Sequence, residues 1–142
     1  MSDGRDTIGI IVAHGELAHG LVDAVRQIVG EGADALIPLS NRGLSPDAIA
    51  AKIVELAGGR RTVIFTDLQS GSCAFAARRL CQQYSALVVV SGVNLPMLLD
   101  FVLHRDMAVA ELVPRVLDKG RMAIGSSPAA LDGADRAAAP SG

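Results

Sequence analysis

A histidine and an aspartate each end an apolar stretch of the chain, and they are the strongest candidates for chemistry. His14 directly follows residues 7–13, and Asp67 closes residues 62–67. In an open parallel sheet, residues at these positions lie at the carboxyl edge, where ligands collect. A carboxylate that accepts a hydrogen bond from Nδ1 fixes the imidazole tautomer, frees Nε2 and stabilises the charged ring that forms on attack. The pair predicts a nucleophilic His14 oriented by Asp67.

A turn of small residues after Asp67 supplies a candidate anion site. Ser70, Gly71 and Ser72 lead into a helical pattern. Free N–H groups and a hydroxyl at the positive end of a helix attract phosphate. Each feature also has a plainer interpretation: His14 as a satisfied histidine, Asp67 as a turn former and Ser72 as a helix cap. Their combination is what favours a phosphate site.

The elements that must position these residues alternate between strand and helix. Strands are predicted at about 7–13, 35–39, 62–67 and 86–90, and helices at about 17–30, 46–57, 72–84, 95–104 and 107–119. Such alternation is typical of an α/β fold with right-handed crossovers. We predict an open, doubly wound, mostly parallel sheet of four strands with helices on both faces. A short antiparallel strand at 121–124 would follow, after a helix closed by Gly120.

Two strands carry signals about their place in the sheet. Pro38 cannot donate to a ladder, so its strand is predicted at an edge. The stretch 86–90 is wholly apolar, so it is predicted to be central and covered on both faces. Ser45 and Asn94 are predicted helix caps, each with a proline in the turn that follows.

Length and composition limit the class of protein. The chain has 142 residues, a net charge of −2 and 3% aromatic residues, which predicts one domain with an aliphatic core and no nucleic-acid partner. We expect the domain at 1–124 and a flexible Ala/Pro/Gly-rich tail at 125–142. No apolar run is long enough to span a bilayer, and residues 1–6 lack a signal-peptide pattern, so a cytoplasmic location is expected.

The remaining candidate residues are predicted to be structural. Cys73 and Cys81 lie about 12 Å apart along one helix, beyond the roughly 7 Å of a disulfide, so buried thiols are expected. Too few His and Cys residues lie near one another to predict a metal site. His19 and His104 are assigned no catalytic role. No dinucleotide, Walker or nucleophile-elbow motif is present, and no cofactor is expected.

Three segments of the chain resemble the enzyme IIA component of the mannose family of the phosphoenolpyruvate-dependent sugar phosphotransferase system. They are Ile10-Ile11-Val12-Ala13-His14-Gly15, Phe65-Thr66-Asp67-Leu68-Gln69-Ser70-Gly71-Ser72 and Ser91-Gly92-Val93-Asn94-Leu95-Pro96-Met97-Leu98. The third is the most distinctive, and with their spacing the three cover about residues 7–124. The chain departs from the family's usual turn, since Ser70 replaces a glycine and Cys73 a proline.

The resemblance implies a phosphocarrier. The histidine matching His14 would accept a phosphoryl group from the phosphocarrier protein HPr and pass it to an enzyme IIB partner, which serves a membrane permease. Asp67 would orient the ring, and Ser70, Gly71 and Ser72 would hold the phosphoryl oxygens, with no metal or nucleotide. Family members are homodimers with an exchanged last strand, which would fit 121–124. A nonpolar rim is hypothesised as the surface that docks HPr, and it consists of Leu17, Leu68, Leu95, Pro96 and Met97.

Three other interpretations stay open at this point. The first is a stand-alone regulatory protein whose phosphorylation state signals metabolic status. The second is the phosphotransfer subunit of a dihydroxyacetone kinase, whose fold is related. The third is a small-molecule binding domain in which His14 is inert.

Overall fold

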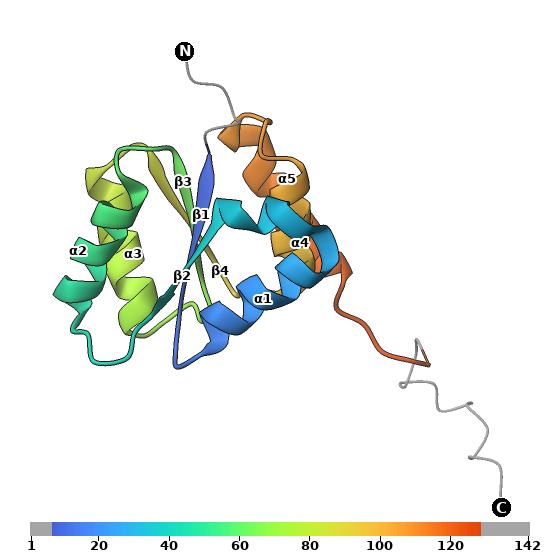
Figure 1. Ribbon diagram of the computed structural model, residues 1–142, viewed down its shortest axis with the longest axis horizontal. Coiled ribbons are helices and arrows are strands. Elements are labelled where there is room, and N and C mark those ends of the chain that lie inside the picture. The colour runs from blue at the N-terminus through green and yellow to red at the C-terminus, as the bar shows by residue number, and fades with distance from the viewer. Residues whose placement is uncertain (1–6, 129–142) are drawn as a thin grey trace, which may run out of the picture.

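The computed structural model describes residues 7–128, which form one parallel four-stranded sheet flanked by helices (Figure 1). The strand order is β2-β1-β3-β4. The strands are β1 (Ile8–Ala13), β2 (Leu36–Ser40), β3 (Thr62–Thr66) and β4 (Leu87–Ser91). The helices are α1 (Leu17–Val29), the 3-10 helix η2 (Gly30–Ala35), α2 (Pro46–Ala57), α3 (Ser72–Gln83), α4 (Leu95–Leu103) and α5 (Val109–Met122).

The helices form two layers, one on each face of the sheet. In Figure 1, α2 and α3 lie on one side of the sheet, and α1, α4 and α5 lie on the other. Alternate β1 side chains enter the two resulting cores: Ile11 packs with residues of α1, α4 and α5, whereas Ile10 and Val12 pack with residues of α2 and α3. The doubly wound parallel sheet of four strands is thereby confirmed.

Two helices begin at the N-cap residues that the sequence predicts. The Ser45 hydroxyl accepts a hydrogen bond from the Ala48 N–H at 3.1 Å, which caps α2. The Asn94 carboxamide accepts one from the Met97 N–H at 3.1 Å, which caps α4. Each cap satisfies an N–H that has no acceptor within its own helix. Pro38 lies in β2, at an edge of the sheet as expected.

The prediction that the stretch 86–90 forms a central strand was wrong, because β4 is the other edge of the sheet. Its apolar sequence has a different cause. Val88 packs against the core on the α1, α4 and α5 side, and Val89 packs against the core on the α2 and α3 side. Helices therefore cover both faces of β4. An apolar strand sequence indicates that both faces are buried, but it does not indicate whether the strand has one neighbour or two.

The predicted strand at 121–124 does not form in the described chain. Arg121 and Met122 complete α5, and Ile124 lies beyond the helix with no strand pairing. Gly120 does not end the helix, because it has a packing role instead. A Cβ on Gly120 would lie 2.5 Å from Cγ of Met97, so only glycine allows α5 to approach α4 this closely.

The predicted domain boundary at residue 124 remains a prediction. Residues 129–142, which make up most of the predicted tail, lie outside the described residues. Within residues 7–128, no helix combines the length and apolar character that a membrane span requires.

Candidate active site

The sheet topology brings His14 and Asp67 together. β1 and β3 are neighbours, and Val12 lies opposite Thr66 in their parallel register. The next residues of both strands therefore leave the sheet side by side at its carboxyl edge. Because β1 connects to α1 on one face and β3 to α3 on the other, this edge is also where the winding of the chain reverses, a usual place for ligand sites.

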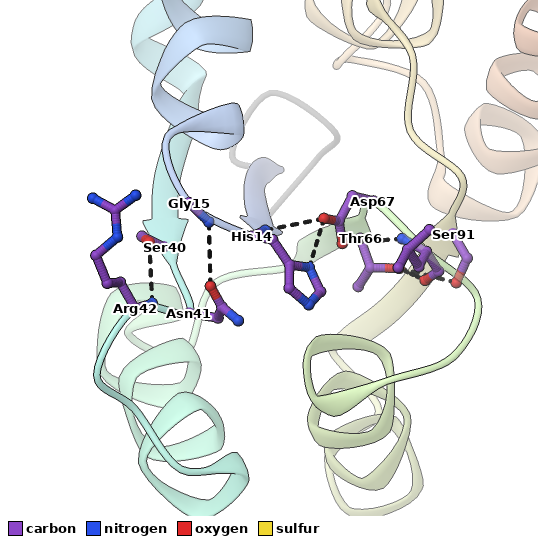
Figure 2. Close-up of polar contacts among 9 residues, drawn as sticks. His14, Gly15, Ser40, Asn41, Arg42, Thr66, Asp67 and Ser91 are labelled. Atoms are coloured by element: carbon purple, nitrogen blue, oxygen red, sulfur yellow. Dashed lines mark hydrogen bonds and ion pairs between the residues drawn. The ribbon is translucent and has the colours of Figure 1, made fainter.

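The Asp67 carboxylate holds the His14 imidazole in one orientation (Figure 2). Nδ1 of His14 lies 2.8 Å from Oδ2 of Asp67, and the backbone N–H of His14 donates to the same oxygen at 3.0 Å. The other oxygen, Oδ1, accepts the Leu68 N–H at 3.0 Å. Since an ionised carboxylate only accepts hydrogen bonds, Nδ1 carries a hydrogen, and in the neutral ring Nε2 then keeps its lone pair. The predicted orienting role of Asp67 matches this geometry.

The Asp67 carboxyl is held in its charged form. Burial raises its pKa, but the hydrogen bonds from the His14 backbone and ring, together with the charge of His14, lower it more, so the pKa lies below the ordinary value of 3.8. An ionised Asp67 can balance the positive charge that a substituted imidazole acquires. The His14 side chain is 48% exposed and that of Asp67 only 10%, so the ring is accessible while its partner is sheltered.

The start of α3 borders the imidazole. A ring nitrogen of His14, a carboxylate oxygen of Asp67 and Sγ of Cys73 all lie within 4.8 Å of one another, and Cys73 is the second residue of α3. The N-cap is Gly71, at a φ of 98° that favours glycine, rather than Ser72. Gly71 has no side chain that could accept hydrogen bonds from the first N–H groups of α3. These N–H groups therefore have no partner within the helix and point outward from its N-terminus.

Of the predicted phosphate-binding residues, Ser70 is exposed, Gly71 caps the helix and Ser72 is half-buried in its first turn. The loop that carries them is fixed at several points. The Thr66 hydroxyl donates to the Leu68 carbonyl at 2.8 Å, and the Arg78 guanidinium donates to the Gln69 carbonyl at 2.6 Å. These hydrogen bonds hold the loop between β3 and α3 in one conformation.

The sequence analysis missed two residues that follow β2 at the same edge. The Asn41 carboxamide oxygen accepts the Gly15 N–H at 3.3 Å, and Arg42 donates to Glu16 at 3.1 Å. Figure 2 shows the Asn41 and His14 side chains extending to the same side of the strand ends. The signal was available: Asn41 follows a strand, so the carboxyl-edge rule that selected His14 and Asp67 selects it too.

The predicted docking rim is partly assembled. Leu17 and Leu68 are 46% and 55% exposed, and the Leu17 N–H donates to the His14 carbonyl at 3.2 Å, which places this leucine beside the site. Leu95 and Pro96 are half-buried. Met97 is only 3% exposed and packs against Gly120, so it belongs to the core and not to the rim.

The other histidines lie outside this site. His19 is exposed on α1. Nδ1 of His104 lies 2.9 Å from the Asp100 carbonyl oxygen and 3.3 Å from its carboxylate. That carboxylate also accepts Nε–H of Arg115 at 3.1 Å, which links α4 to α5. His104 thus takes part in contacts that join α4 to α5.

Comparison with known proteins identifies the family. The family model described as "PTS system fructose IIA component" matches residues 9–117. The sorbose-specific EIIA component of the phosphotransferase system from Klebsiella pneumoniae is 36% identical over 97 residues, or 66% of this chain and 70% of that protein.

Solved structures agree with this assignment. The phosphotransferase system component EIIA from Streptococcus agalactiae superposes with a TM-score of 0.81 and 25% identity, covering 87% of this chain and 99% of that one. The mannose/sorbose-specific IIA subunit from Enterococcus faecalis gives a TM-score of 0.76 and 26% identity, over 85% of this chain and 94% of that one. The chain therefore belongs to the mannose-type enzyme IIA components of the phosphoenolpyruvate-dependent sugar phosphotransferase system, a family of phosphotransferases that act in sugar uptake.

Proposed function

We propose that this protein accepts a phosphoryl group from phospho-HPr on Nε2 of His14 and passes it to an enzyme IIB partner. The observation that carries the proposal is the 2.8 Å contact between Nδ1 of His14 and Asp67. This contact commits one ring nitrogen to the carboxylate and leaves the other as a nucleophile. Because the ring lies half-exposed at the sheet edge, a protein donor and a protein acceptor can reach it in turn.

The transfer balances without a metal or nucleotide. The Nε2 lone pair forms a bond to phosphorus while the bond from phosphorus to the donor breaks, and its electron pair returns to the donor. His14 then carries the phosphoryl group on Nε2 and keeps the hydrogen on Nδ1, so the ring is positively charged and lies against ionised Asp67. A nucleophile of the acceptor reverses the step. Catalysis consists of positioning and charge stabilisation.

The phosphoryl oxygens have donors on two sides of the imidazole. On one side, the first N–H groups of α3 and the Ser72 hydroxyl lie at a positive helix end. On the other side, the Asn41 carboxamide oxygen is taken by Gly15, which leaves its NH₂ group to donate. The two sets of donors would stabilise the part of the negative phosphoryl charge that the positive imidazole ring does not neutralise.

The role in transport is favoured over the signalling role by the relative from Klebsiella pneumoniae, which is described as sorbose-specific. The cytoplasmic location and the homodimer remain predictions, and an exchanged strand would require residues 121–124 to leave the conformation they have in this structure. The free edge of β4 and the exposed side chains of Met122 and Ile124, at 79% and 76%, are consistent with such a dimer.

The direct test is phosphorylation of the purified protein by phosphoenolpyruvate, enzyme I and HPr. One acid-labile phosphate per chain is expected, on a peptide containing His14. Phosphorus NMR of the product is expected to report attachment at Nε2, because Nδ1 is engaged by Asp67. Phosphate at Nδ1, or no phosphate at all, would contradict the proposal.

The docking rim is tested by truncating its two exposed leucines. A chain with both Leu17→Ala and Leu68→Ala is expected to raise KM for phospho-HPr about tenfold with kcat unchanged, because each leucine buries apolar surface only in the complex. Leu103→Ala is the matched control, since Leu103 is 64% exposed at the carboxyl end of α4. An equal KM in all three proteins would remove the rim from the interface.

A further inference from the structure

A thiol with no part in phosphoryl transfer lies inside the proposed site. Sγ of Cys73 is within 4.8 Å of both a His14 ring nitrogen and an Asp67 carboxylate oxygen. The Cys73 residue is fully buried, whereas the His14 ring faces solvent. Among the described residues this is the group of nitrogen, oxygen and sulfur ligands whose spacing suits a single ion.

We propose that His14, Asp67 and Cys73 bind a divalent transition-metal ion of the Zn²⁺ class, and that the bound ion blocks phosphoryl transfer. The inference rests on the proposed function for its consequence but not for the binding itself. It assigns a regulatory or inhibitory site that overlaps the phosphoryl site.

The donor set and its spacing fit such an ion. Zn²⁺ binds sulfur at about 2.3 Å and nitrogen or oxygen at about 2.0–2.2 Å, and three protein ligands with one open position form a common tetrahedral site. Ligand atoms on such an ion lie roughly 3.3–3.7 Å apart. Atoms already within 4.8 Å of one another reach that geometry through small side-chain rotations. The exposed side of His14 provides entry and leaves the fourth position to water.

The three ligands come from three places in the fold. His14 follows β1, Asp67 follows β3, and Cys73 lies in the first turn of α3. Asp67 Oδ1 remains bound to the Leu68 N–H, so its Oδ2 is the oxygen that turns to the ion. No local spacing motif joins these residues, so the sequence does not predict the site.

Metal binding by these three side chains conserves charge and protons. The ion exchanges water ligands for the three side chains, and the Cys73 thiol releases one proton to solvent as it becomes a thiolate. No oxidant or reductant takes part. The metal charge compensates both the thiolate and the Asp67 carboxylate, which would otherwise repel each other in a buried place.

The bound ion removes the nucleophile in either of two ways. If the ion binds Nε2, it occupies the lone pair that attacks phosphorus. If the ion binds Nδ1, the ring hydrogen moves to Nε2, which then has no lone pair to offer. In both cases Asp67 no longer orients the ring for transfer, so an unphosphorylated, metal-bound chain is expected to be inert.

The binding itself is tested by cobalt spectroscopy, which does not depend on any phosphotransfer activity. Titration of the wild-type chain with Co²⁺ is expected to give a one-to-one complex with tetrahedral visible bands and a thiolate-to-cobalt band in the near ultraviolet. Cys73→Ser is expected to lose the thiolate band. Cys81→Ser is the matched control, because Cys81 is a half-buried thiol on the same helix, and it is expected to keep the band. A spectrum without the band, or one unchanged by Cys73→Ser, would overturn the proposal.

The consequence is tested by phosphorylation with and without Zn²⁺. The quantity measured is the phosphorylation rate of each protein with Zn²⁺ divided by its rate without Zn²⁺. Each variant is thus its own reference, and any effect of Zn²⁺ on enzyme I or HPr is the same for every variant. Wild type and Cys81→Ser are expected to be inhibited, and Cys73→Ser and Cys73→Ala to need at least about tenfold more Zn²⁺. Equal sensitivity of all four proteins would refute the inhibitory role. A cobalt complex in a protein that takes up no phosphate would refute the proposed function and leave the metal site standing.

Discussion

A His14→Gln variant is expected to take up no phosphate from phospho-HPr. Glutamine has a side-chain amide whose nitrogen has no available lone pair, so no bond to phosphorus can form at this position. The expected effect is a complete loss, measured as incorporation of labelled phosphate per chain after incubation with phosphoenolpyruvate, enzyme I and HPr. The His14 side chain is 48% exposed but is bonded to Asp67, so its replacement is expected to change the free energy of unfolding by about 0.5–1.5 kcal/mol, the net contribution of one hydrogen bond.

His19→Gln is the matched control for this loss. His19 is an exposed histidine on α1 that contributes nothing to the site, so its variant is expected to be phosphorylated like wild type. Full incorporation into His14→Gln, or a loss in His19→Gln, would assign the phosphoryl group to a different residue.

An Asp67→Asn variant is expected to be phosphorylated about a hundredfold more slowly than wild type, a loss within the range seen when a positioned polar group is removed from a reacting centre. Two physical causes combine. The neutral amide does not balance the charge of a phosphorylated ring, and its single oxygen cannot accept from both His14 and the Leu68 N–H, as the two carboxylate oxygens do. The measurement is the single-turnover rate from phospho-HPr, with Asp34→Asn as the control, since Asp34 is a 71% exposed carboxylate paired with Arg26.

Stability at low pH gives a second readout for the same substitution. The Asp67 pKa is lowered in the folded protein, so ionised Asp67 stabilises the fold above its unfolded pKa near 3.8, and this contribution is lost as the pH falls through the lower, folded value. Wild type is therefore expected to lose stability relative to Asp67→Asn over that acidic range, and the difference to be constant near neutrality. An unchanged transfer rate in Asp67→Asn would remove the carboxylate from the mechanism even if the stability difference were present.

The central pair of the site could be predicted because it depends on topology alone. Once β1 and β3 are adjacent and parallel, residues that follow them must meet, and His14 and Asp67 do. Helix caps such as Ser45 and Asn94 could also be predicted from the sequence, because a cap depends on only about four consecutive residues.

Features that depend on packing between distant segments could not be predicted from the sequence. The glycine at position 120 looked like a helix end, but Met97 of α4 lies where its side chain would be. For the same reason Met97 was assigned to a surface that it does not reach. The apolar run of β4 could not reveal an edge position, because helices cover both of its faces. The approach of Cys73 to His14 required the exact placement of α3 on the sheet.

The two edges of the sheet differ in their capacity to recruit another strand. β2 contains Pro38, which has one donor fewer to offer to an incoming chain, whereas every residue of β4 retains its N–H. The edge formed by β4 therefore has the fuller set of main-chain donors, and main-chain pairing with a further strand would be less hindered there than at β2.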